Sequence, residues 1–482
     1  MWRGDLTGVA SDPTSTRQAI RVTVNPPMSQ WAPSTPSLVA VAARRELLDL
    51  AARRADRLGL VKPGGLTDTS PGIVATGHQA YPWHPGILVK DFAALAAAGQ
   101  HQATPLHLVV DQDQHPVWQI DQPTVTGQRI VVDQLRLTSP HPDVPTGFQA
   151  PLDPESLRRW LGEAGLPVVR GLGEAQTLAE QASVVLDRWR ASVGARLPLV
   201  FASDLALTTA FRDLIVSLLN EAEPAVRSYN RAVAALPGAG VRPLTISREW
   251  VELPLWACRW QQPRRRVYAD LGDRVPILVD EAGTPLPFEQ AGAARIDSPG
   301  DVTLMPRALL MTALMRFLFC DLFIHGTGGE IYDRVTERWW RDWRGEALSP
   351  IAMVTADAYL DLDAPTATRM DLQRAVWYEH HLPFNIDRFA RVDPELALEK
   401  RSLIQHMDDD RDEVRRANAF RRIHDINRSL IESYPQLILD AQNNRRLAQA
   451  GVQNAAVLAR RDWCFALYRP EAIAELRNGI RD

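Results

Sequence analysis

Cysteine is scarce in this chain of 482 residues, which contains only Cys258, Cys320 and Cys464. The three lie far apart and form no CxxC pair, so the sequence predicts neither a disulfide framework nor a zinc knuckle. Few cysteines without a pairing pattern are typical of proteins in a reducing compartment. We therefore expect a cytoplasmic location.

Long apolar runs and an excess of one charge are also missing. The most apolar stretch, residues 308–324, is interrupted by Arg316 and Asp321 and predicts a buried helix, and the first residues lack the apolar segment of a signal peptide. The 54 basic and 58 acidic residues leave a net charge of −4. This balance argues against nucleic-acid and membrane binding and favours small molecules as partners.

The order of apolar runs and turns predicts an α/β fold. Residues 73–75 form a β-prone run, 86–98 a helix and 106–110 a second apolar run. Strand, helix and strand within about 40 residues is the pattern of a parallel sheet. Further strands are predicted at 197–202, 265–270, 275–280 and 321–326, with 265–270 paired with 275–280.

Two domains are expected. The sheet core spans 1–364, with connecting insertions at about 120–196 and 237–300, and a helical domain spans 365–482. In the second domain, apolar residues recur at spacings of seven, four, seven and three, close to a coiled-coil seam: Leu396, Leu403, Met407, Val414 and Ala417. One long helical arm, broken near Pro435, is the expected form.

The first candidate site is the turn in "IVATGHQAYPWHPGILVKDF", residues 73–92. Gly77 and Gly86 flank the passage from strand to helix, where backbone amides and the helix start can bind an anion. Lys90 lies one turn into the helix, so its ammonium can reach back toward a phosphate or carboxylate. Polar side chains lie beside the turn: His78, Gln79 and His84. The alternative is a turn whose glycines relieve strain, with Lys90 in solvent.

The second candidate is "DQDQHP" at 111–116. If the extended geometry persists beyond the strand, Asp111 and Asp113 point to the same side and can hold magnesium or orient an amine. His115 can act as a base or a ligand. Capping of a turn or helix by the two aspartates is the alternative.

The third candidate is "LFIHGTGGEIYDRV" at 322–335, again strand, glycine loop and helix. Its glycines admit close approach of a phosphate: Gly326, Gly328 and Gly329. A dinucleotide fingerprint requires glycine at Ile331, so a Rossmann dehydrogenase is disfavoured. Glu330 can cap the helix start, and His325 is either a buried, hydrogen-bonded histidine or a catalytic one.

Two further groups have structural explanations of their own. The tryptophans Trp339, Trp340 and Trp343 are attributed to packing. The run Arg264–Arg266 is attributed to a solvated strand edge, with binding of an anionic substrate as the alternative.

In this order, "TGHQ", "HPGILVKD", the acidic strand end and "TLMPRAL...LFCDLFIHGTGGEIYD" resemble the bacillithiol biosynthesis cysteine-adding enzymes, the BshC family. The resemblance implies a Rossmann-like core and a C-terminal coiled coil that forms a homodimer. It covers roughly 73–116 and 302–343. The matching positions are Thr76, Gly77, Gln79, Gly86, Lys90, Asp111, Asp113, His115, Gly328, Gly329, Glu330, Ile331 and Tyr332.

The family joins the carboxyl group of L-cysteine to the amine of glucosaminyl malate, an amino-sugar conjugate. Activation by a nucleotide, ATP or ADP, is implied, and no metal ligand is assigned. By analogy, Lys90 with His78 or His84 stabilises phosphate charge. Asp111, Asp113 or His115 binds and deprotonates the amine, while Glu330 and Tyr332 position the substrate.

Two other functions are compatible with the same residues. "LHLVVDQD" also fits a glycosyltransferase in which two carboxylates bind a metal and a nucleotide sugar. A non-catalytic scaffold that keeps the fold and works through its helical arm is the other.

Overall fold

The computed structural model describes residues 20–35, 37–64, 72–272, 276–287 and 302–480. They divide into two compact units. The core unit contains the described parts of 18–122, 134–360 and 461–482, and the helical unit contains 123–133 and 361–460. The boundary expected after residue 364 lies close to the one found after residue 360. The expected helical domain differs at its end, because the chain from Arg461 belongs to the core unit.

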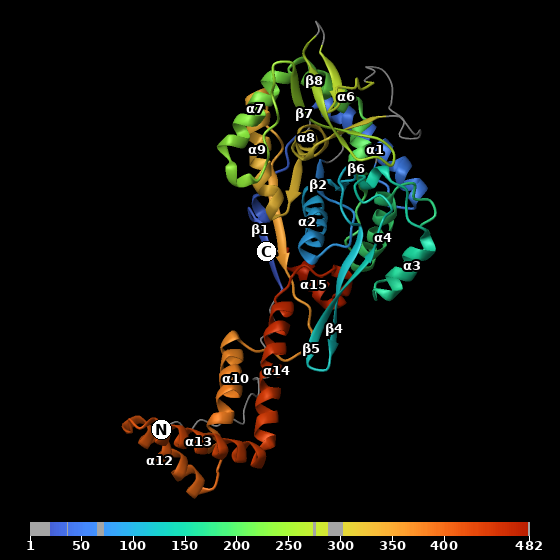
Figure 1. The fold of residues 1–482 in the computed structure, drawn as a ribbon. Helices are drawn as coiled ribbons and strands as arrows, with labels where there is room; N and C mark the ends of the chain where they lie inside the picture. The colour runs from blue at the N-terminus through green and yellow to red at the C-terminus, as the bar shows by residue number, and fades with distance from the viewer. Residues whose placement is uncertain (1–19, 36, 65–71, 273–275, 288–301, 481–482) are drawn as a thin grey trace. The chain divides into compact units, whose positions relative to one another are not determined.

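The core unit is built around a six-stranded, mostly parallel sheet (Figure 1). In spatial order its strands are β1 (Arg21–Asn25), β12 (Ile351–Asp357), β11 (Leu322–His325), β2 (Ile73–His78), β3 (Thr104–Val109) and β6 (Leu199–Phe201). The edge strand β1 is antiparallel to β12, and the other pairs are parallel. The predicted α/β class and the parallel arrangement of the first two strands are confirmed.

Strand β2 shows why consecutive apolar residues form the inner strands. Ile73, Val74 and Ala75 are at most 1% exposed, because both faces of the sheet are covered. Ile73 and Ala75 belong to a core cluster that also takes in α1 (Leu38–Leu58), α8 (Ala308–Leu314) and α9 (Thr327–Arg344). The other face of the strand packs against α2 (Pro85–His101).

The two strand–helix–strand crossovers run in opposite directions from the centre of the sheet. The connection β2–α2–β3 leads toward β6, and β11–α9–β12 leads toward β1. With the usual right-handed crossover, α2 and α9 therefore cover opposite faces. The reversal lies between β2 and β11, the place at which open α/β sheets bind ligands.

A second sheet of four antiparallel strands lies in the core unit. Its order is β10 (Thr303–Pro306), β7 (Trp250–Cys258), β8 (Arg265–Asp270) and β9 (Ile277–Asp280). The predicted pairing of the segments near 265 and 280 is confirmed by the β8–β9 ladder. Much of this sheet comes from the predicted insertion at 237–300.

A hairpin of β4 (Trp118–Thr126) and β5 (Arg129–Leu137) follows β3 and spans the boundary between the units. The other helical segments of the core unit are η1 (Met28–Gln30), η2 (Thr146–Phe148), α3 (Pro154–Glu163), α4 (Leu178–Val193), α5 (Ala202–Ala206), α6 (Thr209–Asn220), α7 (Ala222–Ala235), η3 (Pro237–Ala239), η4 (Met315–Phe319), η6 (Phe465–Leu467) and α15 (Pro470–Asn478).

The apolar stretch 308–324 is only partly helical. Helix α8 continues into the π-helical turn η4, and the chain then enters strand β11. Arg316, which interrupts the stretch, is 2% exposed and pairs with Asp333 of α9. Among the described helices, none has both the length and the apolarity needed to cross a membrane.

The helical unit consists of several helices rather than one long arm. They are α10 (Arg369–His381), η5 (Leu382–Phe384), α11 (Ile386–Phe389), α12 (Pro394–Asp409), α13 (Glu413–Ser433) and α14 (Pro435–Leu458). Its small core contains Leu382, Ile386, Ile426, Leu430 and Ala441. The predicted break near Pro435 is confirmed, since this proline occupies the first turn of α14.

The prediction of one continuous coiled-coil seam was wrong, because the helix is interrupted at residues 410–412. Asp412 caps α13 by accepting hydrogen bonds from the amides of Val414 and Arg415, so the acidic run starts a new helix. Leu396 and Leu403 pack on the small core, whereas Val414 is 70% exposed. The heptad-like spacing thus spans two helices.

A buried aspartate joins the starts of β2 and β11. The Asp321 carboxylate accepts two hydrogen bonds of 2.8 Å from the Arg44 guanidinium of α1 and one of 2.7 Å from the Ile73 amide. Asp321 is fully buried, and Arg44 is 3% exposed. A Cβ at Gly72 would lie 2.8 Å from this carboxylate, so the close approach requires glycine there.

Replacing Asp321 by asparagine should lower the free energy of unfolding by about 3–5 kcal/mol, because it leaves a buried guanidinium without its counter-ion. Urea denaturation at neutral pH measures the change. The control is Asp56→Asn, which breaks a surface pair with Lys62 whose side chains are both 58% exposed; it should cost less than about 1 kcal/mol. Equal losses in the two variants would show that the buried Asp321–Arg44 pair contributes no more to stability than the surface pair.

Candidate functional site

The two glycine-containing turns meet at one edge of the main sheet. Strands β2 and β11 are parallel neighbours, with Ile324 opposite Thr76. The Thr76 hydroxyl donates a 2.9 Å hydrogen bond to the Ile324 carbonyl, 248 residues away in the chain. The carboxyl ends of both strands, and the turns that follow, therefore lie side by side.

In the first turn, Gly77 is needed because a Cβ would lie 2.9 Å from the Leu108 carbonyl of β3. The His78 ring packs edge-on against Tyr81 and Trp83. Burial, together with the nearby Lys90 ammonium, holds the pKa of His78 well below its usual value. His78 is therefore neutral at pH 7.

Lys90 does not extend toward the open edge. Its Nζ donates a 2.7 Å hydrogen bond to the Gly77 carbonyl, and the residue is 4% exposed. Burial lowers the pKa of this ammonium to about 8. Lys90 therefore supports the backbone of β2 and does not reach toward a phosphate as predicted. The alternative, a lysine in solvent, is wrong as well.

His84 and Gly86 form the start of α2. The His84 ring accepts a 3.1 Å hydrogen bond from the Gly86 amide and so caps the helix. A Cβ at Gly86 would meet the His84 ring at 2.8 Å and the Ala356 carbonyl of β12 at 3.0 Å. This glycine permits close packing of helix on sheet, and its amide is already satisfied.

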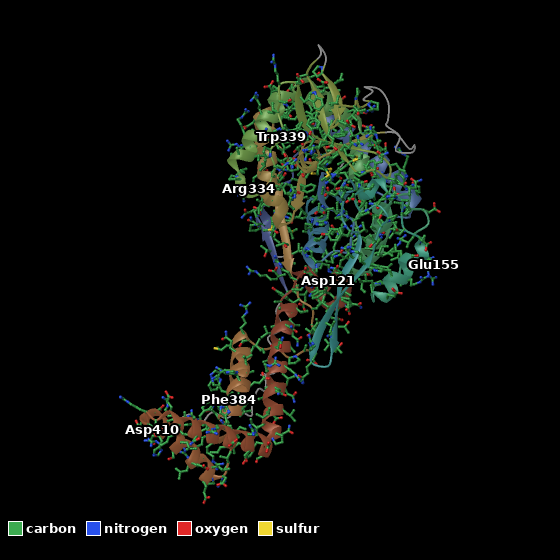
Figure 2. The ribbon with its side chains drawn as sticks, in the orientation of Figure 1. Asp121, Glu155, Arg334, Trp339, Phe384 and Asp410 are labelled. Carbon is green, nitrogen blue, oxygen red and sulfur yellow. The ribbon has the colours of Figure 1, made fainter. Side chains whose placement is uncertain are left out.

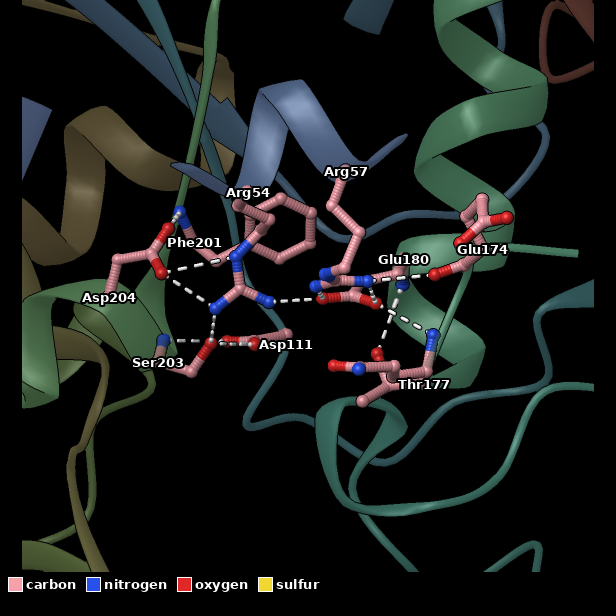
Figure 3. Close-up of polar contacts among 10 residues, drawn as sticks. Arg54, Arg57, Asp111, Glu174, Thr177, Glu180, Phe201, Ser203 and Asp204 are labelled. Carbon is pink, nitrogen blue, oxygen red and sulfur yellow. Dashed lines mark hydrogen bonds and ion pairs between the residues drawn. The ribbon is translucent and has the colours of Figure 1, made fainter. Parts of the chain in front are cut away.

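Asp111 belongs to a buried polar network (Figure 3). Its carboxylate accepts hydrogen bonds from the Ser203 hydroxyl at 2.6 Å and the Ser203 amide at 3.0 Å. Arg54 of α1 contacts Ser203 and pairs with Glu180 and Asp204. Burial raises the pKa of Asp111 to about 6. Asp111 thus holds α5 against the end of β3.

Asp113 has a different environment from Asp111. It accepts a 2.9 Å hydrogen bond from the Gln79 amide and pairs with Arg264 at 2.7 Å, while its side chain remains 34% exposed. Strand β3 ends at Val109 and the chain bends at 112–113, so the two carboxylates do not point to the same side. The prediction of a paired carboxylate site was wrong.

His115 lies close to the first turn. Its Nε2 is 3.4 Å from the Ala80 carbonyl, and its ring meets Tyr81 edge-on at 5.5 Å. Burial is the main cause of a lowered pKa for this imidazole. His115 is thus a neutral group beside the turn, and the charge of the nearby Asp113 carboxylate partly offsets the effect of burial.

The third candidate segment supplies the start of α9. Gly326 is the N-cap residue and contributes no side-chain cap, and a Cβ at Gly326 or Gly328 would meet nothing within 4 Å. Gly329 is required, since a Cβ there would lie 2.4 Å from the His325 ring. The first amides of this helix are therefore open to an anionic group.

Helix α9 carries both buried and exposed side chains, of which Trp339 and Arg334, labelled in Figure 2, are one of each. Trp339 and Trp340 are at most 1% exposed, which confirms their assignment to packing. Glu330 pairs with Arg334 one turn later at 3.0 Å. Burial raises the pKa of the Tyr332 hydroxyl to about 12, and the carboxylates of Asp333 and Asp113 add to the rise. Tyr332 is thus within electrostatic range of Asp113.

Of the predicted residues, Gln79 and Asp113, which follow β2 and β3, are hydrogen-bonded to each other, and Tyr332 in α9 lies within electrostatic range of Asp113. Lys90 and Glu330 have no contact with each other, because α2 and α9 cover opposite faces of the sheet. Asp111 faces Ser203 instead. The candidate site at this edge therefore contains fewer residues than the sequence predicted.

The contact between Arg264 and Asp113 was not predicted from the sequence. Arg264 reaches Asp113 from the second sheet, 151 residues away, and only its place in a basic run hinted at a role.

For His325 the sequence left two explanations open. His325 is 4% exposed and lies 3.1 Å from Asp333, which also pairs with Arg316. The alternative of a buried, hydrogen-bonded histidine is thus confirmed.

Within the described part of the chain, no group of three or more His, Cys, Asp or Glu side chains is arranged to hold a metal ion. A surface hollow of about 430 Å³ lies on the outer side of α9, lined by Leu236, Arg334, Glu337, Arg338, Arg341 and Asp342.

No protein-family model matches this chain, and no curated protein is similar to it in sequence.

Lys90 should make the stability of the protein rise with pH. Its pKa is about 8 when folded and about 10.5 when unfolded, so between these values only the unfolded chain holds the proton. The free energy of unfolding should increase by about 2 kcal/mol between about pH 7.5 and 9.5, and Lys90→Met should lack this increase. Urea titrations across the range measure it.

The control is Lys62→Met, which removes an ammonium from a side chain that is 58% exposed. This variant should retain the wild-type rise. If Lys90→Met shows the same pH dependence as the wild type, the buried lysine is not its source.

Proposed function

We propose that the chain is a cysteine-adding ligase, which forms an amide between L-cysteine and an amino-sugar conjugate such as glucosaminyl malate. The supporting observation is the hydrogen bond between Gln79, which follows β2, and Asp113, which follows β3, beside the reversal point between β2 and β11. The resemblance of the same segments to the cysteine-adding family points to the reaction.

Amide formation from a free carboxylate requires activation. ATP, when bound, supplies the phosphoryl group that makes the carboxyl oxygen a leaving group. The start of α9 suits a phosphate, because its amides are uncapped and the positions of Gly326 and Gly328 leave open space. Glu330 and Gly329 shape this turn through contacts with Arg334 and His325.

Asp113 is the residue that we assign to the amine. Its carboxylate is partly exposed, whereas Asp111 is buried against Ser203. Gln79 orients the carboxylate by donating to one of its oxygens. The attacking nitrogen must lose a proton before it can form the amide bond, and an acceptor at this position can take it. Tyr332 supplies a neutral hydroxyl beside it.

The remaining predicted residues act on the turn rather than on the ligand. Lys90 fixes the Gly77 carbonyl, and His84 fixes the Gly86 amide. His78 and His115 are neutral rings that pack around Tyr81. These contacts hold the backbone from Thr76 to Gly86 in one conformation, which is the positioning that an amide-forming site needs.

The different partners of Asp111 and Asp113 favour the ligase over the alternative of a metal-dependent glycosyltransferase, which was based on these two carboxylates acting as a pair. A carboxylate pair must share one ion to bind a nucleotide sugar in this way. Asp111 is instead occupied by Ser203 and lies near Arg54.

A second copy of the chain is the protein partner that we propose. The helical unit carries many exposed apolar side chains, including Trp377, Leu398, Val414, Phe420 and Leu439, each at least 51% exposed. Apolar surface of this kind marks association between proteins. A homodimer through these helices agrees with the architecture that the family resemblance implies.

Thiol profiling of cells with and without the gene tests the reaction. Loss of the gene should remove a cysteine-containing amide and cause its amino precursor to accumulate. An unchanged thiol profile, together with no amide formed from L-cysteine and glucosaminyl malate by the purified protein with ATP, would reject the ligase.

Asp113→Asn should lower kcat/KM for amide formation by about a hundredfold or more, because the amide side chain no longer accepts the proton. A discontinuous assay of the amide product measures the rate. Asp213→Asn changes an exposed carboxylate on α6 in the same way and should leave the rate unchanged. If the wild-type protein forms the amide and Asp113→Asn is equally active, Asp113 is not the proton acceptor, while the ligase proposal itself stands.

Val414→Glu combined with Phe420→Glu should convert the dimer into monomer, because buried carboxylates would be left unpaired in the interface. Light scattering coupled to size-exclusion chromatography gives the mass. The control is Val39→Glu on α1 of the core unit, since Val39 is also 70% exposed. A wild-type protein that is monomeric at all concentrations would contradict the proposal.

A further inference from the structure

The second sheet gathers arginines around one tryptophan. The guanidinium carbons of Arg264 and Arg307 lie 4.4 Å and 4.1 Å from the ring centroid of Trp256 in β7. A cation held against an indole face is attracted by its quadrupole, and the ring also restricts its orientation. The sequence places these residues in three different segments, so the fold assembles the group.

Neither guanidinium group uses all of its hydrogen-bond donors in the contacts below. Arg264 uses Nη1 for the Gln112 carbonyl and the Asp113 carboxylate, both at 2.7 Å, and its side chain is 19% exposed. Arg307 uses Nε for the Leu255 carbonyl and Nη1 for Glu252. Its Nη2 is buried and has no acceptor in the described part of the protein.

The carboxylates near this group are shared or bound elsewhere. Glu252 pairs with Arg307 at 2.8 Å and lies 4.0 Å from Arg266, which is also close enough to Glu281 to feel its charge. Asp113 pairs with Arg264 and additionally accepts a hydrogen bond from Gln79, which draws it toward the first turn. A further anion would satisfy the donors that these carboxylates leave unused.

We propose that Arg264 and Arg307, held on Trp256, bind the carboxylate or phosphate group of a small molecule at the edge where Asp113 lies. Arginine suits such groups because its planar donors match two oxygens at once. The inference concerns binding, so it holds whether or not the ligase reaction is the activity of the chain. It gives a role to the basic run that the sequence analysis attributed to a solvated strand edge.

Isothermal titration calorimetry of the full-length protein at 150 mM sodium chloride tests the site, with inorganic phosphate and succinate as separate probes. At least one should bind saturably, and the stronger of the two identifies the group. Arg264→Gln should weaken that binding on the order of tenfold or more, since charged hydrogen bonds are lost. Arg264→Lys keeps the charge without the planar donors and should also bind more weakly.

Arg265→Gln is the matched control, because it removes the same charge from the next residue of the same segment, whose partner is Asp280. It should retain the wild-type affinity. Thermal melting of each variant verifies that it is folded. Absence of binding by both probes, equal affinities of wild type and Arg264→Gln, or equal losses in the Gln variants of Arg264 and Arg265 would overturn the proposal.

Discussion

The pairing of β2 with β11 is the constraint on which the proposed site depends, and a buried carboxylate fixes it. The Asp321 carboxylate accepts hydrogen bonds from both Nη atoms of Arg44 and from the amide of Ile73. The start of β11 is therefore fixed to α1 and to the start of β2. A buried ion pair gains little stability overall, but it strongly disfavours any arrangement that leaves one partner alone. Because parallel strands keep their register along their length, fixing one end also brings the turns after His78 and His325 together at the other.

Burial also distinguishes Asp111 from Asp113, although their spacing in the sequence suggested the same role for both. Asp111 lies at the end of β3 beside α5, where Ser203 satisfies both its oxygens and desolvation raises its pKa to about 6. Two residues later the chain has bent, and Asp113 faces Gln79 and Arg264 with part of its surface in solvent. The buried carboxylate is used by the fold, which leaves the partly exposed one for a ligand.

Local patterns explain which parts of the molecule could be predicted. Short apolar runs that end at a turn or at the start of a helix predicted β2, β3, β6 and β11, and the parallel arrangement followed from the helix between the first two. The errors arose where the outcome depends on distant residues or on a bend. Ser203 determines the direction of Asp111, and Asp412 acts as a helix cap where the spacing suggested a continuous seam. Arg264 could not be placed, since its partner is 151 residues away.

The distribution of positive charge at the edge follows from these contacts. Lys90, on the main sheet side, is buried and bound to a backbone carbonyl, so its charge is fixed to the strand. Arg264 and Arg307 come from the second sheet, and each retains donors. In the proposed site, the main sheet therefore supplies the rigid backbone, while the second sheet supplies the groups that we assign to an anion. Changes in the segments around Trp256 would then alter which anion is preferred without disturbing the contacts of Asp321 with Arg44 and Ile73, because the two depend on different side chains.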